Sequence, residues 1–316
     1  MPPSPIPYYS ARDLAEKISM EKAIKLMAAT FRQISSGEAQ VPVRAHIFMP
    51  EEKGQSLFMP AYLAGNKQFG VKVVGIHDEN PQKGLPYIHA IVLVMDAANG
   101  KPLALVDGTY LTALRTGAAS GLATQLLARE DAKTLAVFGA GVQARTQIEA
   151  VLAVRQIKEI LLFNRTAEKA RLLKSEVEEK YRIPCKLAAE EEVEKADIIC
   201  TATSSSTPVF NPSHLKTGPH INAIGAYRKD MVEIPAQTVC NSSVFVDQLS
   251  ATWEEAGDII QPFEAGLITQ NHIKGEIGQI VSGQIAGRTS NEEITLFKSV
   301  GNAAQDIAVA GALLKE

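Results

Sequence analysis

Cysteine is rare in this sequence, since 316 residues contain only Cys185, Cys200 and Cys240. The three are odd in number, and they show neither a CxxC spacing nor nearby histidines. Such a set supports neither a disulfide framework nor a zinc site. We therefore expect reduced thiols, no bound metal and a cytoplasmic protein.

The sequence also lacks an excess of positive charge and any long apolar run. Its 32 Lys and Arg residues face 35 Asp and Glu, a formal net charge of −3, so nucleic acid is not an expected partner. No apolar run reaches the roughly 20 residues of a membrane span. The opening MPPSPIPYYS has neither the basic nor the apolar region of a signal peptide. We expect a globular protein with no membrane association and with room for two cores.

The most informative stretch that is present is Thr134–Val154, TLAVFGAGVQARTQIEAVLAV. A buried strand is expected over Thr134–Phe138, an amphipathic helix over the second half, and a further strand over Glu159–Phe163. Glycines also serve plain turns, but a turn in this βαβ context indicates dinucleotide binding. Its first glycine allows the tight turn, its second lets the backbone approach a pyrophosphate, and the helix N-terminus attracts the anion. The turn consists of Gly139, Ala140, Gly141, Val142 and Gln143, with Ala144 in place of the third glycine.

The end of the second strand indicates which dinucleotide is bound. An NAD site usually has Asp or Glu there, and this chain has Asn164, Arg165 and Thr166. Arg165 could pair with the 2′-phosphate of NADP, and its two neighbours could donate neutral hydrogen bonds. We therefore predict NADP(H) as the cofactor. The alternative is a solvated arginine beside a threonine that caps a helix.

The order of expected elements indicates an α/β fold of two domains. Helices that begin after Ser10 and Ser19 are followed by a strand-rich segment, so residues 1–118 are expected to form an α+β domain. Strands alternate with helices after that, which predicts a doubly wound parallel sheet of the Rossmann type over residues 119–293. Residues 294–316 are expected to return to the first domain as an apolar helix through Ile294, Phe297, Gly301, Ala304 and Ala308.

Three basic residues interrupt apolar patterns in the first domain. They are Arg44 in VPVRAHIF, Lys72 in GVKVVGI and Arg115 in LTALRTGAASG. A buried cation is costly unless it meets an anion, so converging cations would suit a substrate carboxylate. Each could instead be an ordinary structural ion pair or a side chain whose tip reaches water.

Two other polar residues of this domain leave less specific predictions. Asp107 precedes Gly108 at an expected helix start, and it is either an N-terminal cap or a partner that orients Lys72 or Arg115. His89 shares a strand face with Tyr87 and Ile91, and we expect it to be structural.

Eight segments in order along nearly the whole chain resemble the ornithine cyclodeaminase and mu-crystallin family. They are VPVRAHIFMP, LFMPAYLAG, GVKVVGIH, LALVDGTYLTALRTGAASGLA, VFGAGVQARTQIEA, LLFNRT, INAIGAY and TLFKSVGNAAQDIA. The resemblance implies a homodimer whose first domain, completed by the C-terminal helix, binds substrate and forms the dimer interface. It also implies that Arg44, Lys72 and Arg115 bind a carboxylate.

The resemblance further implies a set of residues on the cofactor side. These are the glycine-rich turn, Thr116 beside the cofactor, and a wall near the nicotinamide made by Thr201, Ala202 and Thr203, with Tyr227 also on this side. Cyclodeaminases of the family carry an acid two places after the glycine of the INAIG-like strand, where this chain has Tyr227. With an unperturbed pKa near 10, tyrosine is a poor base at neutral pH.

Reduction of a cyclic ketimine carboxylate requires no base from the protein, unlike cyclodeamination, because the ring imine can enter already protonated. The first hypothesis is therefore an NADPH-dependent reductase that forms L-proline or L-pipecolate. The second is an ornithine cyclodeaminase or an alanine or other amino-acid dehydrogenase on the same scaffold. The third is a non-catalytic, crystallin-like NADP-binding protein.

Overall fold

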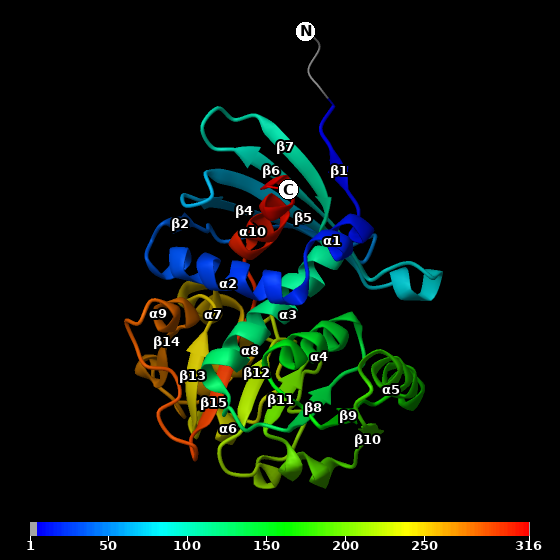
Figure 1. The fold of residues 1–316 in the computed structure, drawn as a ribbon, viewed down its shortest axis with the longest axis vertical. Coiled ribbons are helices and arrows are strands. Elements are labelled where there is room, and N and C mark those ends of the chain that lie inside the picture. The colour runs from blue at the N-terminus through cyan, green and yellow to red at the C-terminus, as the bar shows by residue number, and fades with distance from the viewer. Residues whose placement is uncertain (1–4, 316) are drawn as a thin grey trace. The chain divides into compact units, whose positions relative to one another are not determined.

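A computed structural model describes residues 5–315 of the chain, which divide into two compact units (Figure 1). The first unit comprises residues up to Arg115 together with those from Asn302 onward, and the second is Thr116–Gly301. Helix α3 (Gly108–Leu127) begins in the first unit and ends in the second. Within residues 5–315, no helix combines the length and apolarity of a membrane span.

The first unit begins with two helices whose starts follow from their caps. The side chain of Ser10 accepts a hydrogen bond from the backbone N–H of Asp13 as part of a capping box, and the side chain of Ser19 accepts one from the N–H of Lys22. Both expected N-caps are thus confirmed. The helices are α1 (Ala11–Lys17) and α2 (Met20–Ser35).

A seven-stranded sheet forms the body of the first unit, and it is antiparallel except where β1 pairs with β7. Exposure alternates along β5, so Lys72 points to the same face as Val74 and Ile76, which are buried. Helix α10 (Ala303–Ala312) packs against three central strands and against α2. The strands are β1 (Tyr8–Tyr9), β2 (Ala39–Gln40), β3 (Ala45–Met49), β4 (Gly54–Leu63), β5 (Gln68–His77), β6 (Ile88–Asp96) and β7 (Pro102–Asp107); the short helices η1 (Asn80–Lys83) and η5 (Leu313–Lys315) complete the unit.

The second unit is a doubly wound sheet of eight parallel strands in the order β10-β9-β8-β11-β12-β15-β13-β14, which confirms the predicted α/β fold class. Its strands are β8 (Thr134–Phe138), β9 (Glu159–Phe163), β10 (Cys185–Leu187), β11 (Ile198–Thr201), β12 (His220–Ala223), β13 (Ser242–Val246), β14 (Ile273–Glu276) and β15 (Ile294–Lys298). Its helices are α4 (Val142–Val154), α5 (Ala167–Tyr181), α6 (Ala236–Cys240), α7 (Leu249–Glu255), α8 (Gly257–Glu264) and α9 (Ile277–Val281), with η2 (Glu190–Lys195), η3 (Pro212–His214) and η4 (Gln270–His272).

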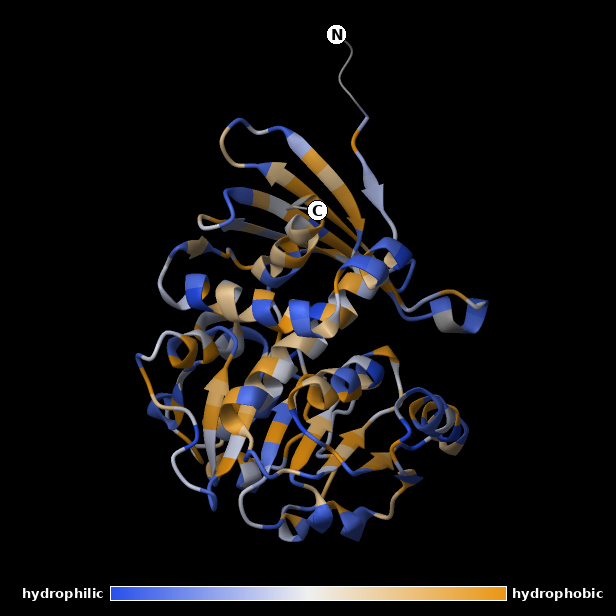
Figure 2. Ribbon diagram, viewed as in Figure 1, coloured by the Kyte–Doolittle hydropathy of each residue, from blue (hydrophilic) through white to orange (hydrophobic). Residues whose placement is uncertain are grey.

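Both faces of this sheet are buried, as the hydropathy of its strands suggests (Figure 2). Leu135 and Val137 of β8 join one hydrophobic core with α4 and α5. Ala136 and Phe138, the alternate residues, join a second core with α6 and α8. The carboxyl ends of β8 and β11 lie next to each other at the point where the strand order reverses, which is where doubly wound sheets bind their ligands.

The expected helix from Ile294 is wrong over its first part. Ile294–Lys298 is strand β15, which lies between β12 and β13 and completes the sheet of the second unit. Its short run of β-branched and aromatic residues suits a buried strand, and Gly301, at a φ of 76°, separates it from α10. The expected amphipathic pattern of α4 is also partly wrong, because two of its polar residues, Thr146 and Gln147, are buried against Thr116 and Gly117.

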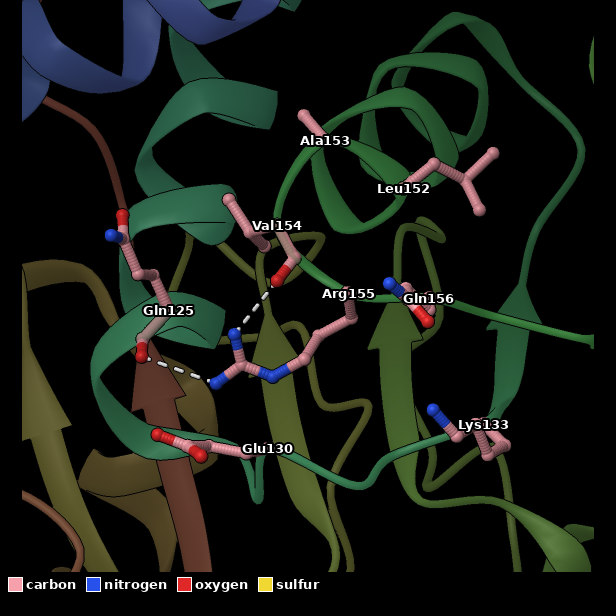
Figure 3. Close-up of a pocket in the computed structure, with 8 residues that line it drawn as sticks. All are labelled: Gln125, Glu130, Lys133, Leu152, Ala153, Val154, Arg155 and Gln156. Atoms are coloured by element: carbon pink, nitrogen blue, oxygen red, sulfur yellow. Dashed lines mark hydrogen bonds between the residues drawn. The ribbon is translucent and has the colours of Figure 1, made fainter.

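Arg155 closes the C-terminal end of α3. Its guanidinium donates hydrogen bonds to the carbonyl oxygens of Thr124, Gln125 and Ala128 at the end of the helix, and of these Thr124 O also accepts from the backbone N–H of Ala128. It also donates to the carbonyl oxygens of Arg129 and Val154. Figure 3 shows the bonds to Gln125 and Val154. The side chain lies beside a surface pocket of about 830 Å³.

We predict that Arg155→Met lowers the free energy of unfolding by about 2–3 kcal/mol, because several partly buried carbonyls lose their donor. Denaturant titration followed by circular dichroism measures the change. The matched control is Lys158→Met at a nearby exposed position, which should shift stability by no more than about 0.5 kcal/mol. Equal stability of the Arg155 variant and the native protein would contradict the assigned role.

Candidate active site

Lys72 is the most deeply buried of the three predicted cations, with 2% of its surface exposed. Its Nζ atom donates to Thr112 Oγ1 at 2.9 Å and to Asp306 Oδ1 at 3.0 Å. The pKa of Lys72 is lowered to about 8, mainly by burial; the charges of Arg115 and Arg44 also lower it, and Asp306 opposes them. The ammonium group is therefore held in place by a carboxylate while two other cations act on it.

Arg115 shares that carboxylate. Its Nε donates to Asp306 Oδ1 at 3.2 Å, and its Nη1 donates to Gln305 Oε1 at 3.0 Å. Arg44 immediately precedes β3, is partly exposed, and lies close enough for its charge to affect Lys72. The structure therefore brings the three expected cations together in the first unit.

Lys72 and Arg115 have more N–H donors than the hydrogen bonds they make within the described residues. An ammonium group has three N–H donors and a guanidinium has five. Within residues 5–315, Lys72 and Arg115 each make two hydrogen bonds. The remaining donors suit a carboxylate, which arginine binds in a planar fork and lysine attracts as a point charge.

The first turn of α10 adds polar side chains that sequence reasoning missed. Asp306 is fully buried, and its Oδ2 atom lacks a hydrogen-bond partner among the described residues. The same holds for Gln305 Nε2 and for both amide atoms of Asn302, which is 4% exposed. Buried polar atoms are normally paired, so several together indicate a ligand site. The signal available in the sequence was a polar triplet, Asn302, Gln305 and Asp306, within an otherwise apolar terminal segment.

In the second unit, the glycine-rich turn has the geometry that a pyrophosphate requires. Gly139 has a φ of 107°, and a Cβ atom there would lie 2.5 Å from the carbonyl oxygen of Ala202. A Cβ on Gly141 would meet no described atom within 4 Å, so this side of the turn is open. Gly141 is the N-cap of α4 and makes no side-chain cap bond, which leaves the first N–H groups of the helix for an anion. These residues fit a dinucleotide.

Four further residues were expected to bind the cofactor, three in the glycine-rich turn and one in α3. Ala140 is buried, whereas Val142 is 62% exposed. Gln143 Oε1 is buried and lacks a hydrogen-bond partner within residues 5–315. Thr116 is buried, and its carbonyl oxygen accepts a hydrogen bond from Gln147 of α4.

The residues after β9 match the expected position of a ribose site. Asn164 Nδ2 donates to the carbonyl oxygen of Thr166 at 2.7 Å, which shapes the turn, and Arg165 is exposed. Thr166 stands at the N-cap of α5, as the alternative interpretation expected, but its side chain makes no cap hydrogen bond. An arginine and two neutral donors are therefore available where an NAD site would have an acid.

Thr201 is the last residue of β11, and Ala202 and Thr203 follow it beside the turn. The backbone N–H of Ala202 donates to Phe138 O at 2.9 Å, which links the ends of β11 and β8. Tyr227 is partly buried, with the guanidinium of Arg228 6.0 Å from its ring centroid. No pattern in the sequence predicts a role for Glu233, yet its carboxylate accepts hydrogen bonds from both Thr201 and Thr203.

The two less specific predictions of the first unit have different outcomes. Asp107 Oδ1 accepts a hydrogen bond from the backbone N–H of Tyr110, so the capping alternative is confirmed. His89 is exposed.

The chain is similar over nearly its whole length to known reductases and dehydrogenases. Delta(1)-pyrroline-2-carboxylate reductase of Bacillus cereus is 42% identical over 304 residues, which cover 95% of this chain and 93% of the relative. The structure of Thermococcus litoralis Delta(1)-pyrroline-2-carboxylate reductase in complex with NADH and L-proline has a TM-score of 0.94 at 40% identity and covers 98% of this chain and 97% of its own.

An archaeal alanine dehydrogenase dimer with bound NAD has a TM-score of 0.92 at 34% identity, and covers 98% of this chain and 95% of its own. These similar proteins are reductases and dehydrogenases, and the chain is an NAD(P)H-dependent oxidoreductase. The sequence profile of one family matches residues 8–315. The chain therefore belongs to the ornithine cyclodeaminase/mu-crystallin family.

Proposed function

We propose that this protein reduces cyclic ketimine carboxylates with NADPH, converting Δ1-pyrroline-2-carboxylate to L-proline and Δ1-piperideine-2-carboxylate to L-pipecolate. The observation that carries the proposal is the pair of buried cations, Lys72 and Arg115, that share one carboxylate oxygen and keep further donors. Two similar proteins are Delta(1)-pyrroline-2-carboxylate reductases, and one of them was solved in complex with NADH and L-proline. This similarity supports a cyclic ketimine carboxylate as the substrate.

The first unit would hold the acid group of the substrate. Arg44, Lys72 and Arg115 supply the positive charge, and the side chains of Asn302 and Gln305 offer amide donors and acceptors for the rest of the ring. The nicotinamide, when bound, supplies a hydride to the imine carbon. A protonated ring imine then needs no enzymic base, so the task of the protein is to orient the substrate and to exclude water.

Tyr227 supports reduction over cyclodeamination. It occupies the position at which cyclodeaminases of the family are expected to carry an acid, and a tyrosine is a poor base at neutral pH. The buried cations argue against a purely structural, crystallin-like protein. Burying Lys72 and Arg115 costs free energy, and binding of an acidic substrate would explain why charged residues occupy these positions.

The substrate assay is the direct test of this proposal. Initial rates of NADPH and NADH oxidation with five- and six-membered cyclic ketimines should exceed the rate of ammonia release from ornithine or of alanine oxidation. Ammonia release from ornithine at a comparable rate would favour the second hypothesis, and no turnover of any of them would favour the third.

We predict that Lys72→Met lowers kcat/KM for the ketimine by about 100-fold or more, because a desolvated charge that faces the substrate is lost. The dissociation constant for NADPH, measured by nucleotide fluorescence, should change by less than about twofold, since the anchor binds the acid and not the cofactor. The exposed Lys101→Met is the matched control. Unchanged turnover in the Lys72 variant would show that the lysine is structural.

The nucleotide preference rests on Asn164, Arg165 and Thr166. We expect Arg165→Gln to raise the KM for NADPH by about tenfold or more and to leave the KM for NADH nearly unchanged, because only NADPH has a 2′-phosphate for the guanidinium to bind. Steady-state kinetics with both nucleotides at saturating ketimine measure the ratio. A parallel change for both nucleotides would contradict pairing with the phosphate.

We also propose a homodimer formed by the first unit. Its sheet carries exposed apolar side chains on β3 and β6 and beside them, which a second copy of the chain could bury, and one similar protein is an alanine dehydrogenase dimer. These residues are Val43, Ile47, Phe48, Tyr87 and Ile91. Sedimentation equilibrium would give the native mass.

A further inference from the structure

Glu233 is a fully buried carboxylate that contacts two loops at the carboxyl edge of the parallel sheet. It accepts hydrogen bonds from Thr201 Oγ1 at 2.9 Å and from the backbone N–H of Thr203 at 2.6 Å, both at the end of β11. It also accepts from the N–H groups of Gly225 at 2.7 Å and Ala226 at 3.2 Å, both after β12. One side chain therefore joins the segments that follow two neighbouring strands.

The set of donors suits an ionised carboxylate. Burial raises the pKa of Glu233, and Asp258 raises it further, while Lys298 and the hydrogen bonds from Thr203 act in the opposite direction. Three of the four partners are backbone N–H groups, which can only donate. A neutral amide at this position would direct its own N–H groups at donors.

Glu233 is in turn held by a buried ion pair. Asp258 Oδ1 of α8 accepts from the backbone N–H groups of Glu233 at 2.7 Å and Ile234 at 3.0 Å. Its Oδ2 accepts from Lys298 Nζ at 2.8 Å, at the end of β15. The charges of Asp258 and Lys298 are fully buried. This ion pair therefore holds the backbone of Glu233 in place.

The loops that Glu233 joins are packed against the glycine-rich turn. A Cβ atom on Gly139 would lie 2.5 Å from Ala202 O and 3.5 Å from Thr203 Cγ2. A Cβ on Gly225 would lie 2.3 Å from Thr203 O and 2.5 Å from Glu233 Oε1. The segments after β8, β11 and β12 are thus in contact with little spare space, at the edge where a doubly wound sheet binds a dinucleotide.

We propose that Glu233 is a positioning residue for the cofactor, and that its carboxylate fixes the separation of the loops after β11 and β12 on which the nicotinamide half of the dinucleotide rests. The inference rests on the proposed function only in requiring a dinucleotide, and it does not depend on the ketimine.

The test is the variant Glu233→Gln, which keeps the shape of the side chain and replaces one oxygen by an N–H donor. We expect the dissociation constants for NADPH and NADH, measured by nucleotide fluorescence without ketimine, to rise about tenfold or more, because one loop loses its acceptor and shifts. Thermal unfolding of the free protein is recorded in parallel.

Asp197→Asn is the matched control. Asp197 also accepts hydrogen bonds from two backbone N–H groups, those of Lys133 at 2.8 Å and Thr134 at 3.0 Å, but at the amino ends of β8 and β11. This variant should lose thermal stability while its dissociation constants stay within about twofold of the native values. A destabilised Glu233→Gln that binds both nucleotides as tightly as the native protein would overturn the proposal, as would an equal loss of binding in Asp197→Asn.

A second variant applies if Glu233→Gln does not fold. Thr201→Val removes one hydroxyl donor from the carboxylate and preserves the volume of the side chain, so it should weaken nucleotide binding by a smaller factor, about threefold. Unchanged binding in this variant would contradict the role of Glu233. A native protein that binds nucleotide but does not reduce ketimines would refute the proposed function and leave this inference intact.

Discussion

The shared carboxylate oxygen of Asp306 is the interaction on which the first unit depends. It brings Lys72 of β5 and Arg115 of α3 to one residue of α10. Without a nearby carboxylate, two buried cations would repel each other and would be costly to desolvate. Because Asp306 pairs with both through one oxygen, the pair is stable without substrate and still retains donors for an acid. The same contact attaches the C-terminal helix to strands more than 200 positions earlier in the chain.

Much of the fold could be predicted from the sequence because its signals are local. The caps Ser10 and Ser19, the alternation of strands and helices, and the turn from Gly139 to Gln143 are each determined by residues within a few positions of one another. Charges within apolar patterns need partners, but the residues alone left open whether Lys72 and Arg115 converge or form separate ion pairs; only the family resemblance implied a common role. Local signals failed for Ile294–Lys298, where a stretch of five residues with three apolar side chains suits either a strand or a helix.

Glu233 and the polar residues of α10 show a different limit of sequence reasoning. The partners of Glu233 are mainly backbone N–H groups, which every residue except proline possesses, so they leave no residue type to recognise. The sequence shows Asn302 and Gln305 as polar residues in an apolar segment, but their burial without hydrogen-bond partners is seen only in three dimensions. The family resemblance covered the segment that contains them but gave no reason to single them out.

The strand order has a consequence for how such an enzyme could be redesigned. Asn164–Thr166 follow β9, whereas the loops joined by Glu233 follow β11 and β12, and β8 lies between the two groups of strands. Changes at sites that share no contacts tend to be additive. In the proposed arrangement, laboratory evolution or natural drift could therefore change the preferred dinucleotide through Asn164–Thr166 without moving the loops proposed to hold the nicotinamide.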